Sequence, residues 1–90
     1  MYKLEFLRKA VDDLKKIDKA NQKVIKGKLL ILAKNPLALK NNIKLIGDKE
    51  EKLYRLRVGS YRVIFKRKEK ELIIIIVRIG HRKEIYLSLK

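Results

Sequence analysis

The part of this sequence that most constrains the fold is a pair of alternating segments joined by a two-residue turn. Leu53 to Val58 and Tyr61 to Lys66 each alternate apolar residues with residues that are mostly basic, and Gly59-Ser60 lies between them. Two such segments around a connection that begins with Gly predict a β-hairpin with a type II′ turn. A turn of this length also sets the register, so that Arg57 lies directly opposite Arg62.

One face of the predicted hairpin is basic and the other is apolar, because successive residues of a strand point to opposite sides. The basic face holds Arg55, Arg57, Arg62, Ile64 and Lys66. The apolar face, which we assign to the core, holds Tyr54, Leu56, Val58, Tyr61, Val63 and Phe65. Like charges placed directly opposite destabilise a sheet by a few tenths to about 1 kcal/mol, and an anion between Arg57 and Arg62 would remove that penalty.

Arginine is concentrated in this half of the chain. The sequence has 18 Lys and 7 Arg, and all but one of the Arg residues follow position 54. Lys would serve a solvated sheet face or a generally Lys-rich surface equally well, whereas the planar guanidinium of Arg binds phosphate through two hydrogen bonds. We therefore interpret the basic face as a phosphate-binding surface. The candidates for phosphate or RNA binding are Lys52, Arg55, Arg57, Arg62 and Arg78.

The first third of the sequence predicts a short strand followed by two helices. Tyr2, Leu4 and Phe6 alternate with polar residues, as in a strand with one buried face. From Leu7 to Ile17 the apolar residues recur at helical spacing, and a second helix capped by Asp18 or Asn21 ends at Asn35-Pro36. The residues of this second helix that we expect to be buried are Val24, Ile25, Leu29 and Leu32, with Ile31 and Ala33 added.

The remaining segments complete a single α+β domain over residues 1–90. Asn35 to Asn42 is predicted to be a loop. After a charged reversal at Lys68 to Glu71, Leu72 to Ile79 is predicted to be a central strand buried on both faces. The predicted order is β-α-α-β-β-β, with the two-helix antiparallel hairpin packed on a twisted, mainly antiparallel sheet. The last residues, Ile85 to Leu89, form either a short strand or a helical turn.

The net charge of +15, from 25 basic and 10 acidic residues, is spread along the chain. Its self-repulsion weakens the compact state unless a polyanion or an acidic protein partner neutralises it. The chain has no Cys, which excludes disulfides, a thiolate metal site and a Cys nucleophile. Its longest apolar run, Leu72 to Val77, is far shorter than the roughly 20 residues of a membrane span, so we expect a cytoplasmic protein.

Three further residues beyond the hairpin are candidates for the site. Arg78 interrupts an apolar strand, and it joins the Arg62 face if the preceding turn has three residues but the opposite face if the turn has another length. His81 is the single His of the chain, and its ordinary pKa near 6.5 suits proton transfer at neutral pH. Arg82 follows it, and Tyr86 comes five residues after His81.

Two segments together resemble the RelE/ParE toxin superfamily. They are Tyr54-Arg55-Leu56-Arg57-Val58-Gly59-Ser60-Tyr61-Arg62-Val63-Ile64-Phe65 and Ile79-Gly80-His81-Arg82-Lys83-Glu84-Ile85-Tyr86. The likeness extends over the whole length, since an opening strand, two helices and Lys44-Leu45-Ile46-Gly47 also match the family's pattern. The resemblance implies the same fold as the residue patterns: a two-helix hairpin on a mainly antiparallel sheet.

The RelE branch implies a ribosome-dependent endoribonuclease that cuts messenger RNA in the A site, beside 16S rRNA, without metal or another cofactor. In this chemistry the ribose 2′-hydroxyl attacks the adjacent phosphate, which requires a base, an acid and cations that stabilise the developing charge. The resemblance assigns Arg57, Arg62 and Arg82 to phosphate binding and transition-state stabilisation, and Tyr86 to orienting the nucleotide. Relatives often carry Lys where this chain has Arg55 and Arg57, and Arg is a poorer proton carrier. Our choice for proton transfer is therefore His81 with Tyr86 as its partner, because they are the nearest groups with usable pKa values.

The resemblance also implies a partner and two rival functions. A RelB-like antitoxin, acidic and amphipathic, would wrap the toxin, block its basic face and offset its charge. The ParE branch shares this fold but inhibits DNA gyrase and cuts no RNA. The charge alone would also permit a basic RNA- or ribosome-binding module without catalysis.

Overall fold

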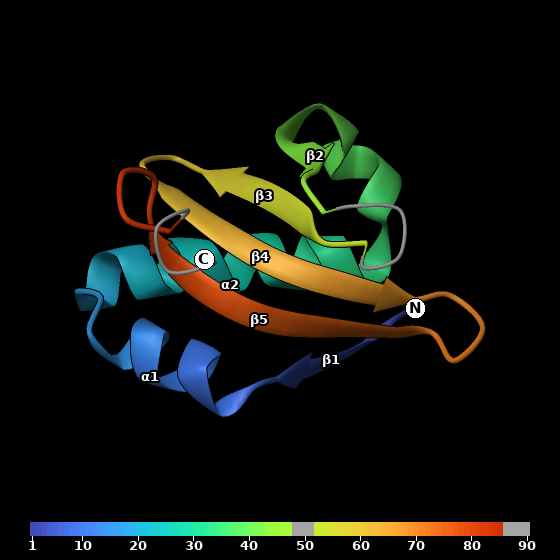
Figure 1. Cartoon of the computed structure of the whole chain (residues 1–90), viewed down its shortest axis with the longest axis horizontal. Coiled ribbons are helices and arrows are strands. Elements are labelled where there is room, and N and C mark those ends of the chain that lie inside the picture. The colour runs from blue at the N-terminus through green and yellow to red at the C-terminus, as the bar shows by residue number, and fades with distance from the viewer. Residues whose placement is uncertain (48–51, 86–90) are drawn as a thin grey trace.

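A five-stranded mixed sheet with helices against one face and one edge makes up the chain, in a computed structural model that describes residues 1–47 and 52–85 (Figure 1). The elements are β1 (Lys3–Phe6), α1 (Arg8–Lys15), α2 (Lys19–Lys34), the 3₁₀ helix η1 (Pro36–Asn42), β2 (Ile43–Leu45), β3 (Tyr54–Val58), β4 (Tyr61–Lys68) and β5 (Ile73–His81). The strand order is β1-β5-β4-β3-β2, with β1 parallel to β5 and the other neighbours antiparallel. The predicted α+β class and mainly antiparallel sheet are therefore confirmed, whereas the predicted order β-α-α-β-β-β lacked the three-residue strand β2.

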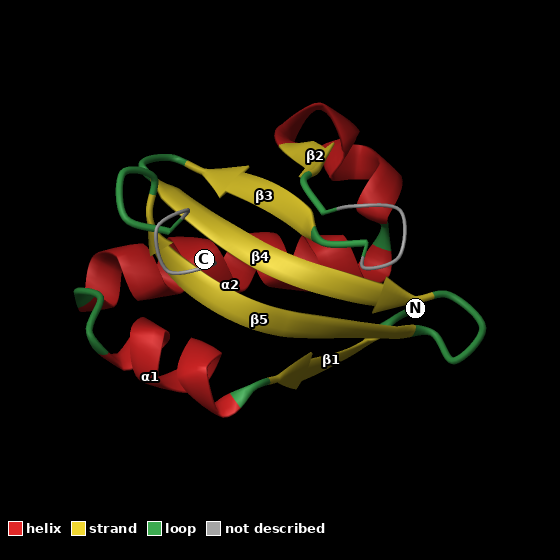
Figure 2. Ribbon diagram, in the orientation of Figure 1, coloured by secondary structure: helices red, strands yellow, loops and turns green. Residues whose placement is uncertain are grey.

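Helix α2 crosses behind the sheet, and α1 lies along the edge where β1 ends (Figure 2). Asp18 caps α2: its carboxylate accepts a hydrogen bond from the Asn21 amide at 3.2 Å and another from the Asn21 side chain at 2.8 Å. These bonds lower the pKa of Asp18 below its ordinary value. No helix in the described part of the chain is long and apolar enough to cross a membrane.

The core lies between α2 and the inner face of the sheet. Its members are Ala10, Ile25, Leu29, Leu32, Leu39, Leu56, Val58, Val63, Phe65, Ile74, Ile76 and Ile79. Of the α2 residues expected inside, Ile25, Leu29, Leu32 and Ala33 are buried, but Val24 and Ile31 are exposed at 53% and 40%. The expectation was wrong for these two residues. They are seven positions apart and so lie on the same side of the helix, and this side does not meet the sheet.

Most of the segment from Asn35 to Asn42, expected to be a loop, instead forms η1 (Pro36–Asn42), which leads directly into β2. Pro36 suits the first turn, because its ring holds φ near the helical value and its missing N–H has no role there. The amide of Ala38 then donates to the carbonyl of Asn35 at 3.0 Å. A 3₁₀ helix this short has no hydrophobic period that a sequence could display.

Strand β5 lies between β1 and β4 but is not buried on both faces as expected. Ile74, Ile76 and Ile79 face the core, whereas Ile73, Ile75 and Val77 are half-buried on the other side. The turn before β5 spans four residues, since Lys68 pairs with Ile73. An irregularity then follows, because Ile64 pairs with Arg78 but Phe65 pairs with Ile76, so Val77 has no opposite residue on β4.

Candidate nucleic-acid interface

The β3–β4 turn has the predicted geometry and places two arginines opposite each other. Gly59 has a φ of +58°, and Ser60 is not among the residues with positive φ, as a type II′ turn requires. Val58 pairs with Tyr61 and Arg57 pairs with Arg62. Because Val58 and Val63 belong to the core, Arg57 and Arg62 point away from α2. We call this side, with Arg55, Arg57, Arg62 and Ile64, the outer face of the sheet.

The two opposed guanidinium groups differ in how they are held. Arg62 is only 9% exposed, and its Nη1 donates to the carbonyl oxygens of Gly59 at 2.8 Å and Tyr61 at 2.9 Å. These carbonyl dipoles offset part of the repulsion that a second positive charge creates. Arg57 is exposed. The pair thus combines a fixed cation at the turn with an accessible one beside it.

The chain after β5 returns to the same end of the sheet. The Arg82 amide donates to the carbonyl of Ser60 at 2.8 Å, so the exposed Arg82 lies beside the β3–β4 turn. Gly80 pairs with Arg62, and a Cβ at Gly80 would lie 3.2 Å from Cδ1 of Ile85. The buried Ile85 therefore folds over the outer face at Gly80, where a larger residue would crowd the end of its side chain. Arg57, Arg62 and Arg82 are brought to one end of the sheet.

His81 lies on the opposite face of the sheet from Arg57 and Arg62. It pairs with Tyr61, whose side chain packs against the core, so its ring lies on the inner side. The two rings meet edge to face with centroids 6.0 Å apart, and the Lys83 amide donates to His81 Nδ1 at 3.4 Å. A cavity of about 360 Å³ borders His81, Tyr61, Lys16 and Glu84. The expected grouping of His81 with Arg57 and Arg62 is not what the fold produces.

The guanidinium of Arg78 forms an ion pair with a carboxylate, a contact that the sequence did not indicate. Its Nε and Nη2 donate to the two carboxylate oxygens of Asp13 at 2.8 and 3.1 Å, and the Ile79 amide donates to the same Asp13 at 3.0 Å. These hydrogen bonds raise the pKa of Arg78 above its ordinary value. Asp13 lies on α1, 65 residues away, and binds the edge of β5 beyond the end of β1. Arg78 therefore joins a helix to a strand edge, and its donors Nε and Nη2 are both engaged.

The remaining candidates are spread along β3 or lie outside the described residues. Arg55 is half-buried, and its buried Nε has no hydrogen-bond partner within the described chain. Lys52 is exposed just before β3, about 20 Å from the turn at the rise of an extended strand. Tyr86 lies outside the described residues. Among residues 1–47 and 52–85, no three His, Asp or Glu side chains converge as metal ligands would.

Comparison with known proteins gives both sequence and structural matches. Residues 4–86 match the family described as ParE toxin of type II toxin-antitoxin system, parDE. A chain in the RelB–RelE antitoxin–toxin complex from Methanococcus jannaschii is 32% identical, with a TM-score of 0.70 over 91% of this chain and 94% of that one. The archaeal RelE–RelB complex from Pyrococcus horikoshii OT3 gives 25% identity and a TM-score of 0.77, over 90% and 94% of the two chains.

A third structure shares the fold at lower identity. YafQ from E. coli strain BL21(DE3) is 15% identical, with a TM-score of 0.75 over 96% of this chain and 99% of that one. No curated protein matches the sequence significantly. The arrangement of sheet and helices is thus shared more widely than the sequence.

Proposed function

Because this chain belongs to the RelE/ParE superfamily of toxins from type II toxin-antitoxin systems, we propose that it is a ribosome-dependent endoribonuclease that cuts messenger RNA in the A site. The supporting observation is the convergence of Arg57, Arg62 and Arg82 around the β3–β4 turn. Three arginines at one end of the sheet suit a phosphate that gains negative charge as the 2′-hydroxyl attacks it.

The roles within this site follow from how each group is held. Arg62 is positioned in advance by the Gly59 and Tyr61 carbonyls, which suits transition-state stabilisation, because little reorganisation is needed. Arg57 and Arg82 are exposed and would meet the RNA backbone. Tyr86 would orient the nucleotide. His81 lies on the inner side with Tyr61, so it is poorly placed for proton transfer on the outer face.

We also propose a RelB-like antitoxin as the inhibitory partner. Relatives from Pyrococcus horikoshii and Methanococcus jannaschii were crystallised in complexes with RelB. The net charge of +15 favours an acidic partner that covers the arginines of the outer face. Such a partner would compete with RNA for the same guanidinium groups.

Cell-free translation of a defined messenger tests the proposed activity. We expect new 5′ ends at A-site codons, and we expect Arg57→Ala and Arg82→Ala each to reduce cleavage by about 10- to 1,000-fold. Arg8→Ala is the matched control, since Arg8 is an 87% exposed cation on α1 and its loss should leave cleavage unchanged. Intact messenger together with salt-sensitive ribosome binding would instead indicate a binding module without catalysis.

The match to the family described as ParE toxin favours one second candidate, inhibition of DNA gyrase. In that case the exposed arginines would contact the gyrase complex in place of messenger RNA. A supercoiling assay distinguishes the two functions: gyrase-dependent DNA breaks alongside uncut messenger would replace the ribonuclease proposal with this one.

A further inference from the structure

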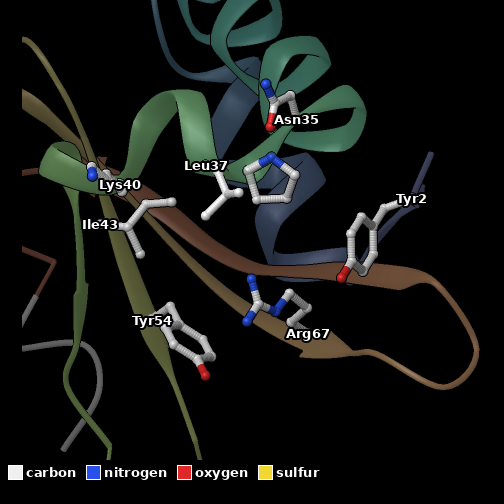
Figure 3. A pocket seen from close by; sticks show the side chains of 8 residues that line it. Tyr2, Asn35, Leu37, Lys40, Ile43, Tyr54 and Arg67 are labelled. Carbon is white, nitrogen blue, oxygen red and sulfur yellow. The ribbon is translucent and has the colours of Figure 1, made fainter.

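A cavity of about 410 Å³ lies at the other end of the sheet from the β3–β4 turn. It opens between η1 and the inner face of the sheet, and it is lined by Tyr2, Asn35, Pro36, Leu37, Lys40, Ile43, Tyr54 and Arg67 (Figure 3). Arg62 and Arg67 are five residues apart on β4, so the cavity lies about 17 Å from the arginines at the turn. Its volume falls within the range of small-ligand sites.

Arg67 and Tyr54 both line this cavity, and the guanidinium of Arg67 lies over the Tyr54 ring. The rings of Phe65 and Tyr54 are stacked, with centroids 5.4 Å apart and 20° between their planes. The Arg67 guanidinium lies 5.6 Å from the Tyr54 centroid, and in Figure 3 it is seen between the rings of Tyr54 and Tyr2. A guanidinium plane of this kind is a surface on which an aromatic ring stacks.

The hydrogen-bonding capacity of Arg67 is only partly used. Its Nη2 donates to Glu69 at 2.6 Å, and its buried Nε has no hydrogen-bond partner within the described chain. A guanidinium carries five N–H donors, so most of them remain available for a ligand once a small side-chain movement exposes them. Glu69 holds one end of the group and leaves its plane beside the cavity.

The other lining groups suit a base and a phosphate together. Among residues 1–47 and 52–85, no carboxylate lines the cavity, whereas Lys40 adds a second cation and Asn35 adds a side-chain amide. An amide is the side-chain group that pairs with adenine through two hydrogen bonds, and an ammonium binds phosphate oxygens. Leu37 and Tyr2 supply apolar surface for the edges of a ring.

We propose that this cavity binds one unpaired nucleotide of RNA, with its base stacked on Arg67 and its phosphate near Lys40. The inference rests on RNA as the proposed target, but it does not depend on cleavage. The cavity would be a second RNA contact, separate from the arginines at the β3–β4 turn. It would anchor an unpaired nucleotide of ribosomal or messenger RNA while the outer face engages the scissile phosphate.

NMR titration of the ¹⁵N-labelled protein with hexaadenylate tests this residue by residue. We expect the amide signals of Tyr2, Leu37 and Ile43 and the side-chain Nε–H signal of Arg67 to shift on addition of RNA. Arg67→Gln should raise the dissociation constant measured from the three amide signals by about tenfold, because the variant loses the stacking of one base. Arg67→Lys should raise the dissociation constant by a similar factor, because Lys keeps the positive charge but lacks the flat guanidinium group.

Two controls separate stacking from general electrostatics. Arg8→Gln removes the same charge from an exposed site on α1 and should change the dissociation constant by no more than about twofold. Lys40→Gln, at an exposed position, tests the phosphate contact even if the Arg67 variants fail to fold. Shifts confined to the outer-face residues would overturn the proposal. So would equally strong shifts at the cavity with a hexaglutamate peptide, which would assign it to an acidic protein partner.

Discussion

The bond between Asp13 and Arg78 makes a strong prediction about stability. In Asp13→Ala, α1 loses a bidentate ion pair to β5 and the Ile79 amide loses its acceptor. The two side chains are only 13% and 24% exposed, so water replaces these bonds incompletely. Charge-assisted hydrogen bonds contribute about 1.5–3 kcal/mol each when buried, and partial exposure reduces their sum. We expect the free energy of unfolding to fall by about 2–3 kcal/mol, which corresponds to a decrease of about 10–20 °C in Tm.

Asp12→Ala is the control for this prediction, because Asp12 is the adjacent carboxylate on the same helix. Its pair with Arg8 is 3.4 Å long, with side chains 49% and 87% exposed, and should contribute less than about 0.5 kcal/mol. Urea unfolding followed by circular dichroism measures both variants. In an Arg78→Met background, Asp13→Ala should cost less, since only the Ile79 bond remains to be lost. Equal urea midpoints for the Asp12 and Asp13 variants would refute the reasoning.

Two glycines and one helix cap provide further predictions. Gly59→Ala should destabilise the protein by about 1 kcal/mol, because φ at this position is +58°. Gly27→Ala, in a helix with open space around it, should stabilise the protein by about 1 kcal/mol. Thermal unfolding should therefore show a lower Tm for the first variant and a higher Tm for the second. The pKa of Asp18 is lowered below 3.8, so its contribution is present above that pH and is lost as pH falls through the folded value. In Asp18→Asn the side chain still caps the helix but does not titrate. When helicity is followed as the pH is lowered, the part of its loss that comes from protonation of Asp18 should therefore be absent in this variant. An unchanged acid profile in that variant would contradict the assignment.

Much of the site's framework was readable from local sequence. Gly59-Ser60 predicted the turn type and the Arg57–Arg62 pairing, because a two-residue hairpin leaves one register. Asp18 was one of two predicted caps, and Asn35-Pro36 correctly ended the second helix. These features depend on residues within a few positions of one another, where backbone geometry leaves few alternatives.

Longer-range placement was not readable in the same way. A run of four Ile between Leu72 and Val77 fits either face, so it could not set the register of β5 or indicate the irregularity at Val77. That register places His81 beside Tyr61, away from Arg62. The sequence also shows Asp12 and Asp13 as two equivalent surface acids, and only the approach of α1 to β5 distinguishes them.

By itself the sequence determined the hairpin, its arginine pair and the strong positive charge, since each follows from residue type and short spacing. Only the tertiary structure decided which charges are available to a ligand. It fixes Arg62 on the turn carbonyls, binds Arg78 to Asp13 and places Arg67 over Tyr54 beside a cavity. The reason is that a charge's availability depends on partners brought together by packing, and those partners lie up to 65 residues apart along the chain.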